Sequence, residues 1–393
     1  LKLAASAIIF IFLIPYTASL YNGLSRLFGM AFDIDYSICV IVMAILTGVY
    51  VIAGGYMATA INDFIQGIIM LVGIAAVILA VLNSQGGFLA SLEKLARVQG
   101  DSAIPGVYAS FFGPDPVNLL GVVILTSLGT WGLPQMVQKF YAIKSEAAIS
   151  KGTVISTAFA LVVAGGCYFL GGFGRLFSDR IDIAANGYDS VIPTMLSGLP
   201  AILIAVVVIL VLSASMSTLS SLVLASSSTL TLDFIKGNII KDMDEKRQVR
   251  WMRGLVVVFI AISVVLALIQ YKSSVTFIAQ LMGVSWGALA GAFLAPFLYG
   301  LYWKRTTKAA CWVSFVFSTV FMLAVISPVK GSLPALLQSP INAGAFCMIV
   351  GLAVVPVVSL FTKAPDRKRL EDVFSCYERK VTVTVRDSIG EQE

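Results

Sequence analysis

Histidine is absent from this sequence of 393 residues, and charged residues are scarce. Without imidazole the chain has no histidine metal ligand and no histidine base for catalysis. Its five cysteines are isolated, four of them within apolar segments, so neither a disulfide framework nor a CxxC metal site is present. No pair of catalytic carboxylates lies within the apolar segments either. These absences argue against an enzyme and against a redox protein.

Only 12% of the residues are charged, whereas 58% are hydrophobic and the mean hydropathy is +0.93. A helix needs about 20 mostly apolar residues to cross a bilayer, and such stretches follow one another along the chain without the alternation of a β-strand. We therefore predict an all-α polytopic membrane protein with about ten transmembrane helices. The predicted spans are 3–29, 36–54, 63–83, 117–139, 154–176, 199–230, 252–271, 276–302, 309–328 and 341–363.

The placement of lysine and arginine predicts the orientation of these spans. With ten spans, 20 of the 27 basic residues fall on the side that holds both ends of the chain. Positive charge collects in cytoplasmic loops, so we expect both ends in the cytoplasm and the protein in the plasma membrane as a multi-pass protein. Residues 1–363 then form the transmembrane core and 364–393 a cytoplasmic tail. The net charge of +6 reflects this topology and does not indicate nucleic acid as a partner.

A serine-rich stretch, residues 213–228, is the strongest functional signal. It places many hydroxyls in a segment that is otherwise apolar enough to cross a bilayer. Hydroxyl and carbonyl oxygens at positions i, i+3 and i+4 share one helical face, and such oxygens can replace the hydration shell of a small cation. Close packing between membrane helices is the alternative use of serine, threonine and alanine. Taken alone, the segment is compatible with a sodium site and with packing.

Asp63 is a second candidate, at the beginning of an apolar span and close to Asn62 and Gln66. An aspartate in a first helical turn caps the helix in many proteins. No lysine or arginine is near in sequence, however, and an unpaired carboxylate at a membrane rim often marks a path for ions or protons. Both interpretations remain open at this point.

Two further segments interrupt apolar spans. Residues 129–140 contain two glycines and Pro134, so the helix there is predicted to kink or loosen. Broken helices in transporters hold ligands, although an ordinary proline kink is the simpler explanation. In the second segment, 280–287, the side chains of Gln280, Ser285 and Trp286 could face a solute or another helix.

Taken in order, these segments resemble the sodium:solute symporter family, whose members share the inverted-repeat fold of the leucine-transporter type. Residues 54–67 resemble the Gly-Gly…Thr-Asp…Gln signature of the fifth core helix. The most specific match is 214–221, continued by 226–227 and Asp233, which resembles the eighth core helix. Residues 134–146 are similar to the segment that leaves the sixth core helix, and 302–307 to the end of the tenth.

The resemblance implies a sodium site to which the eighth core helix contributes a backbone carbonyl and two hydroxyls. These positions are Ala214, Ser217 and Thr218 in this chain. Some family members bind a second sodium between the aspartate of the fifth helix and further serines of the eighth. In this chain the corresponding positions, for a second ion site or a proton path, are Asp63, Ser220 and Ser221.

Two departures from the family pattern affect what is expected. The ten spans match the last ten of a typical thirteen, which implies that three amino-terminal helices lie outside this sequence, either because it is a fragment or because the product does not transport. In addition, Thr126 and Thr130 stand where the proline-transporting branch has a tryptophan and a tyrosine. Proline is therefore not favoured as the solute. The candidate solute-binding residues are Thr126, Thr130, Gln280, Ser285 and Trp286.

The hypothesis is sodium-coupled symport of a small organic solute by alternating access, with Na⁺ as the coupling ion and no other cofactor. The expected partners are the solute, Na⁺ and the lipid bilayer. A non-transporting membrane sensor or scaffold with the same fold is the alternative from another class. A proton-coupled carrier is the alternative within the same fold.

Overall fold

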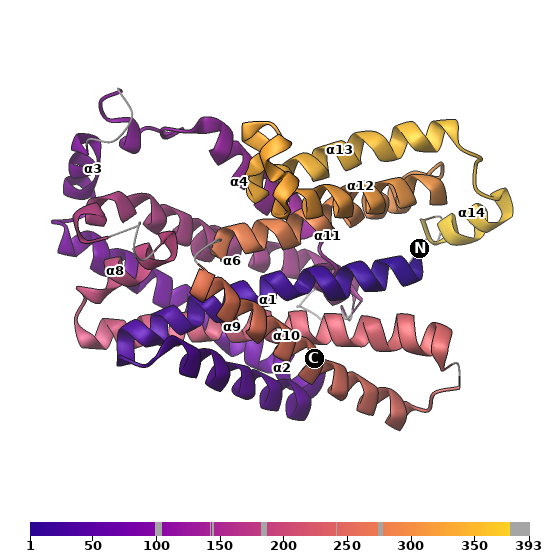
Figure 1. The fold of residues 1–393 in the computed structure, drawn as a ribbon, viewed down its shortest axis with the longest axis horizontal. Helices are drawn as coiled ribbons and strands as arrows, with labels where there is room; N and C mark the ends of the chain where they lie inside the picture. Colours follow the sequence, from indigo (N-terminus) through magenta and orange to yellow (C-terminus); the bar gives the residue numbers. More distant parts are fainter. Residues whose placement is uncertain are drawn as a thin grey trace, which may run out of the picture.

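A computed structural model gives the fold of residues 1–98, 104–141, 143, 145–181, 187–240, 242–273 and 278–377. Every regular element in these residues is helical. The long helices run side by side along the longest axis of the molecule (Figure 1). Their bounds are α1 Lys2–Phe32, α2 Tyr36–Ser84, α4 Pro116–Gly132, α5 Pro134–Phe140, α6 Glu146–Gly172, α9 Ala201–Thr229, α10 Glu245–Ser273, α11 Ile278–Tyr302, α12 Lys308–Ile326 and α13 Pro340–Phe361.

Shorter helices lie at the two ends of the bundle. The α-helices α3 (Phe88–Arg97) and α8 (Val191–Ser197) lie at one end, and α14 (Arg367–Phe374) lies with the amino terminus at the other (Figure 1). We call the end with α14 the lysine-rich end, because Lys304, Lys308 and Lys363 lie there. The short connecting helices are η1 Val107–Ala109, η2 Phe173–Arg180, η3 Tyr188–Ser190, η4 Leu230–Ile239, η5 Pro328–Ser332, η6 Ala335–Gln338 and η7 Ser375–Tyr377.

The predicted spans are confirmed. Nine helical segments of the described residues are long and apolar enough to cross a membrane, and the bent pair α4 and α5 makes a tenth when it is counted as one span. Each corresponds to one predicted range. The segment that includes α6 is only 6% buried in its most apolar window, so most of its apolar side chains lie on the outside of the bundle. This distribution is typical of a multi-pass membrane protein, in which lipid covers the outer apolar surface.

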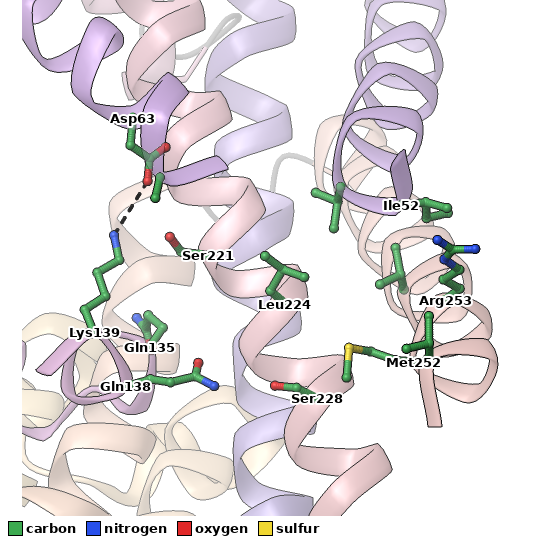
Figure 2. Close-up of a pocket in the computed structure, with 14 residues that line it drawn as sticks. Ile52, Asp63, Gln135, Gln138, Lys139, Ser221, Leu224, Ser228, Met252 and Arg253 are labelled. Atoms are coloured by element: carbon green, nitrogen blue, oxygen red, sulfur yellow. Dashed lines mark ion pairs between the residues drawn. The ribbon is translucent and has the colours of Figure 1, made fainter. Parts of the chain in front are cut away.

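Helix α2 contains two of these segments, Tyr36–Gly54 and Ala60–Ser84, and Figure 2 shows Ile52 of the first and Asp63 of the second on separate stretches of helix. The side-chain amide of Asn62 donates a hydrogen bond of 3.0 Å to the Tyr50 hydroxyl. In a straight helix, residues twelve positions apart would be about 18 Å apart along the axis. The two parts of α2 therefore meet near Tyr50 and Asn62. This reversal places residues of both parts around the same cavity, as described below.

Helix α11 is the most buried span and packs against α1, α4, α12 and α13. Glycines allow this close approach. A Cβ atom at Gly287 would lie 2.6 Å from the Cα of Gly344 on α13, and one at Gly291 would lie 2.7 Å from the Cβ of Cys347. Small residues let membrane helices approach until their backbones touch, which increases dispersion contacts along the interface. The α11–α13 contact consequently depends on the absence of side chains at these positions.

The predicted division at residue 363 remains a prediction. Helix α13 ends at Phe361, and α14 and η7 follow it within the described residues. The rest of the predicted tail, 378–393, lies outside the described residues.

We expect Gly287→Leu to destabilise the folded protein by about 3 kcal/mol or more, because the new side chain has no space between α11 and α13. Gly300→Leu is the matched control on the same helix, since nothing lies within 4 Å of a Cβ at Gly300. Thermal unfolding in detergent, followed by tryptophan fluorescence, measures the difference. Equal melting temperatures for the two variants would contradict the packing described here.

Candidate functional site

The serine-rich stretch lies on α9, and several of its hydroxyls donate to carbonyls one turn earlier. Thr218 Oγ1 donates to the Ala214 carbonyl at 3.0 Å. The hydroxyls of Ser220 and Ser221 both donate to the Ser217 carbonyl, at 3.0 and 3.1 Å. A hydroxyl that donates its proton to a carbonyl in this way can still offer its oxygen lone pairs to a second partner. Two of the three predicted sodium ligands, the Ala214 carbonyl and the Thr218 hydroxyl, are therefore already in contact.

Asp63 faces this helix from the second part of α2. Asp63 Oδ2 lies 3.9 Å from Lys139 Nζ on α5 (Figure 2), and the Ser217 side chain of α9 lies near the Asp63 carboxylate. The other carboxylate oxygen, Oδ1, is buried and has no hydrogen-bond partner among the described residues. The Asp63 side chain is 23% exposed, against 48% for Lys139, so the ion pair is partly screened from water.

The structure corrects two expectations about Asp63. The aspartate that caps α2 is Asp35, which accepts from the backbone N–H of Ser37 at 2.8 Å, whereas no backbone N–H of the described residues donates to the Asp63 carboxylate. Asp63 is therefore not a helix cap. Nor is its carboxylate unpaired, because Lys139 comes from a helix that is distant in sequence. Because Lys139 is far from Asp63 in the sequence, local sequence patterns do not reveal this pair.

A cavity of about 510 Å³ opens beside this ion pair, and we call it the Asp63 cavity. Figure 2 shows Ser221, Leu224 and Ser228 along α9 on one wall, with Ile52 of α2 and Arg253 of α10 on another. Its walls combine apolar side chains with a few polar ones, which is typical of a ligand-binding cavity. Of the site residues predicted from the sequence, Asp63 and Ser221 line it.

Gln135 lies in the wall of the Asp63 cavity, and its side-chain amide is 3% exposed. Neither its Nε2 nor its Oε1 atom has a hydrogen-bond partner among the described residues. The same is true of the buried Gln66 Oε1, one turn after Asp63. An unpaired buried amide costs about 1–3 kcal/mol, so polar groups left in this state often serve a ligand or an ion.

The predicted break in residues 129–140 positions Gln135 and Lys139. Helix α4 ends at Gly132 and α5 begins at Pro134, with a bend of 47° between them. Gly132 packs against α11, where an added Cβ would lie 2.9 Å from the Cα of Ala290. The bend turns α5 toward α9, which it contacts. Gln135, Gln138 and Lys139 follow at i, i+3 and i+4 and so share one face of α5.

The candidate solute-binding residues lie on two helices that pack together, α4 and α11. An added Cβ at Gly129 would lie 2.9 Å from the Trp286 ring, and Tyr16 of α1 stacks edge-on against that ring at 5.8 Å. Thr126 and Thr130 each donate to a carbonyl of their own helix. Ser285 is fully buried, and Gln280 is half-buried on the same helix. None of the four main cavities of the described residues is lined by these five residues.

A polar cluster closes the other end of the bundle around Asp189 in η3. Its carboxylate is 7% exposed, accepts from the Ile278 backbone N–H at 3.0 Å, and lies 3.8 Å from Arg26 Nε on α1. Burial raises the pKa of Asp189, while the Ile278 N–H and the Arg26 guanidinium act in the opposite direction. The carboxylate thus ties the beginning of α11 to α1 at the end opposite to α14.

Comparisons with known proteins agree with this architecture. The family model described as "Sodium:solute symporter family" matches residues 1–316. A sodium/proline symporter of Staphylococcus aureus is 30% identical over 375 residues, which are 93% of this chain and 70% of that protein. The sodium/proline symporter of strain JH9 gives the same values. The chain belongs to the sodium:solute symporter family.

The fold also resembles the solved structure of a Na⁺-coupled symporter. A Na⁺-coupled sialic acid symporter, in a substrate-bound outward-open state with a novel Na⁺ site, superposes with a TM-score of 0.69 over 92% of this chain and 74% of that chain, at 14% identity. The predicted family and its fold are thus confirmed. The family consists of sodium-coupled transporters and not of enzymes, and Na⁺ is its coupling ion.

Several residues of this symporter were not among the sequence candidates. Lys139 and Gln135 lie within the broken-helix motif, but their chemical roles depend on α9 and α2, which are far away in sequence. The spacing of Gln135 and Lys139 at i and i+4, which places both side chains on one face of a short helix, was the sequence pattern that could have indicated them. Tyr16 stood in an apolar span with no distinguishing pattern. The residues predicted for sodium and solute remain predictions, because the comparisons concern the family and the fold.

We expect the stability of the symporter to depend on pH through Asp189. Because burial raises the pKa of Asp189, the native state binds this proton more readily than the unfolded chain does. Wild type should therefore gain stability relative to Asp189→Asn as the pH falls from neutral toward about 4, and lose this gain as the pH rises. Melting temperatures of both proteins across this range measure the difference. A difference that is constant with pH would contradict the burial of this carboxylate.

Proposed function

We propose that this chain couples the entry of Na⁺ to the uptake of a small organic solute by alternating access across the plasma membrane. Na⁺ binds to the Ala214 carbonyl and to the hydroxyls of Ser217 and Thr218. The observation that carries this proposal is the contact of 3.0 Å between Thr218 Oγ1 and the Ala214 carbonyl on a half-buried face of α9. These are hard oxygen ligands of the kind that Na⁺ requires, and they are held together before any ion arrives.

Coupling follows from unequal affinity of Na⁺ for the two arrangements of the bundle. One positive charge that crosses the membrane down a potential of 100 mV gains about 2.3 kcal/mol. The bent pair α4 and α5 and the fold in α2 are natural places for movement, because they already interrupt straight helices. The orientation with both chain ends in the cytoplasm remains part of this proposal.

For the solute we propose a small molecule with an apolar part, bound against Trp286 when α4 and α11 move apart, because Gly129 of α4 and the Trp286 ring are in close contact in this structure. Tyr16 and Trp286 offer an aromatic surface, and Thr126 and Thr130 offer hydroxyls from the opposite helix. The curated relatives are sodium/proline symporters, which favours an amino acid as the first class to test. Thr126 and Thr130 argue for a solute different from proline itself.

We also propose that Asp63 forms a second cation site, with Lys139 as its resident counter-ion. The Lys139 ammonium lies 3.9 Å from Asp63 Oδ2, beside Ser217 and the cavity wall at Ser221. A cation that binds Asp63 must compete with this ammonium. The carboxylate therefore exchanges one positive partner for another and is not left unpaired within the membrane.

We expect Ser217→Ala/Thr218→Ala to abolish sodium-dependent uptake, because the double variant removes two of the three oxygen ligands. The matched control is Ser227→Ala/Thr231→Ala, which removes two buried hydroxyls of the same chain segment; each of these also bonds to a carbonyl one turn earlier. Uptake of amino acids, sugars and carboxylates is measured in proteoliposomes that contain the protein with any flanking sequence its gene encodes. Equal uptake by both double variants would mean that these hydroxyls serve packing.

We expect Lys139→Gln to raise the apparent Na⁺ affinity for uptake roughly three- to tenfold, because a competing positive charge leaves Asp63. Lys151→Gln is the control, since Lys151 lies on α6 and lines none of the four main cavities. In an Asp63→Asn background the same substitution should have no effect. An unchanged Na⁺ dependence in Lys139→Gln contradicts the competition. Uptake that follows pH and ignores Na⁺ would identify the proton-coupled carrier instead.

A further inference from the structure

A second large cavity lies at the lysine-rich end of the bundle, remote from Asp63. It measures about 580 Å³ and lies between the end of α11, the beginning of α12, the segment after α13, and α14. Lys304, Lys308 and Lys363 line it, each from a different segment. Trp303 and Phe374 contribute apolar walls. We call this cavity the lysine groove.

The charge of the lysine groove is strongly positive. The carboxylate that lines it, Asp366, accepts from the backbone N–H of Lys368 at 3.3 Å and so caps α14. Within the described part of the chain, no carboxylate lies within ion-pair distance of Lys304, Lys308 or Lys363. Three ammonium groups around one cavity repel each other, and a multivalent anion between them relieves this repulsion.

Specific contacts hold the walls of the groove together. Tyr377 donates to the Leu301 carbonyl at 3.0 Å, which fixes the chain after α14 against the end of α11. The Lys304 ammonium lies 5.5 Å from the centre of the Phe374 ring, a cation–π arrangement that joins the same two segments. Arg305 donates to the Leu360 carbonyl at 3.2 Å and links the α11–α12 corner to α13. The groove is thus a built feature of the fold.

The position of the lysine groove in the bundle indicates the chemical class of its ligand. The groove lies where two membrane spans, α11 and α13, end and another, α12, begins, so it is at the level of lipid headgroups. Phe361 at the end of α13 is 87% exposed and Val373 of α14 is 59% exposed, which provides apolar surface next to the ammonium groups. Basic cavities between transmembrane helices bind the phosphates of anionic lipids, whose acyl chains occupy the neighbouring apolar surface. A free phosphate ion would use the charge and leave the apolar surface uncovered.

We propose that the lysine groove is a binding site for the headgroup of an anionic phospholipid. The phosphodiester lies between Lys304, Lys308 and Lys363, and the acyl chains extend along the exposed surface near Phe361. Binding of this lipid fastens α14 to the ends of α11 and α13. This proposal is independent of the solute and of the sodium sites.

Native mass spectrometry of the purified protein in detergent tests the proposal, with phosphatidylglycerol and phosphatidylcholine as the two probes. We expect wild type to retain phosphatidylglycerol at least about tenfold more tightly than phosphatidylcholine. Lys304→Gln/Lys308→Gln/Lys363→Gln should lose this preference. The matched control, Lys151→Gln/Lys236→Gln/Lys246→Gln, removes the same charge from residues that line none of the four main cavities and should keep it.

A conservative variant and a competitor complete the test. Lys304→Arg/Lys308→Arg/Lys363→Arg preserves the charge and the contact with Phe374, so it should retain the lipid even if the glutamine variant unfolds. Excess inorganic phosphate should not displace phosphatidylglycerol. Equal retention of both lipids by wild type would overturn the proposal, and so would an equal loss in the two glutamine triples. Displacement by inorganic phosphate would assign the groove to a soluble anion and would also overturn it.

Discussion

The need to pair every polar group inside an apolar bundle is the constraint on which this structure depends. Several serine and threonine residues on α9 meet it by bonding to carbonyls of their own helix, as Thr218 does with Ala214. Asp63 meets it by pairing with Lys139. Each solution leaves oxygen lone pairs available for a cation. Gln135 is one of several exceptions, since both polar atoms of its buried amide lack a partner among the described residues. Unpaired buried polar atoms of Asp63, Gln66 and Gln135 lie at or near the Asp63 cavity, and others lie on α1, α11, α12 and α13.

The packing of α11 makes this arrangement possible. Gly287 lets the backbones of α11 and α13 meet, and Gly132 brings the end of α4 against α11. Because α4 stops there and α5 continues at an angle of 47°, Gln135 and Lys139 reach the neighbourhood of α9. The helix breaks before Pro134 and is held against α11 there by the close packing of Gly132, and this break determines which side chain approaches Asp63. The packing of α11 is in this way linked to the proposed cation site at Asp63.

Much of the fold could be predicted from the sequence, because the length and hydropathy of each span are local properties. The ten spans and the break near Pro134 were predicted for this reason. The Asp63–Lys139 pair could not be predicted, since it depends on how α2 and α5 come together. The same holds for the reversal of α2, where Tyr50 and Asn62 lie in one helix yet bond to each other. Local patterns identified α9 as the centre of the site, but the partners of its side chains are tertiary properties.

Direct binding of ²²Na⁺ to the purified protein, compared between wild type and Thr218→Val, is the most direct test of the central claim. Valine keeps the shape of threonine and replaces its hydroxyl with a methyl group. If the Ala214 carbonyl and the Thr218 hydroxyl hold the coupling ion, wild type should bind Na⁺ saturably, Li⁺ should compete better than K⁺, and Thr218→Val should lose most of this binding. Undiminished Na⁺ binding in Thr218→Val would contradict a sodium site on this face of α9.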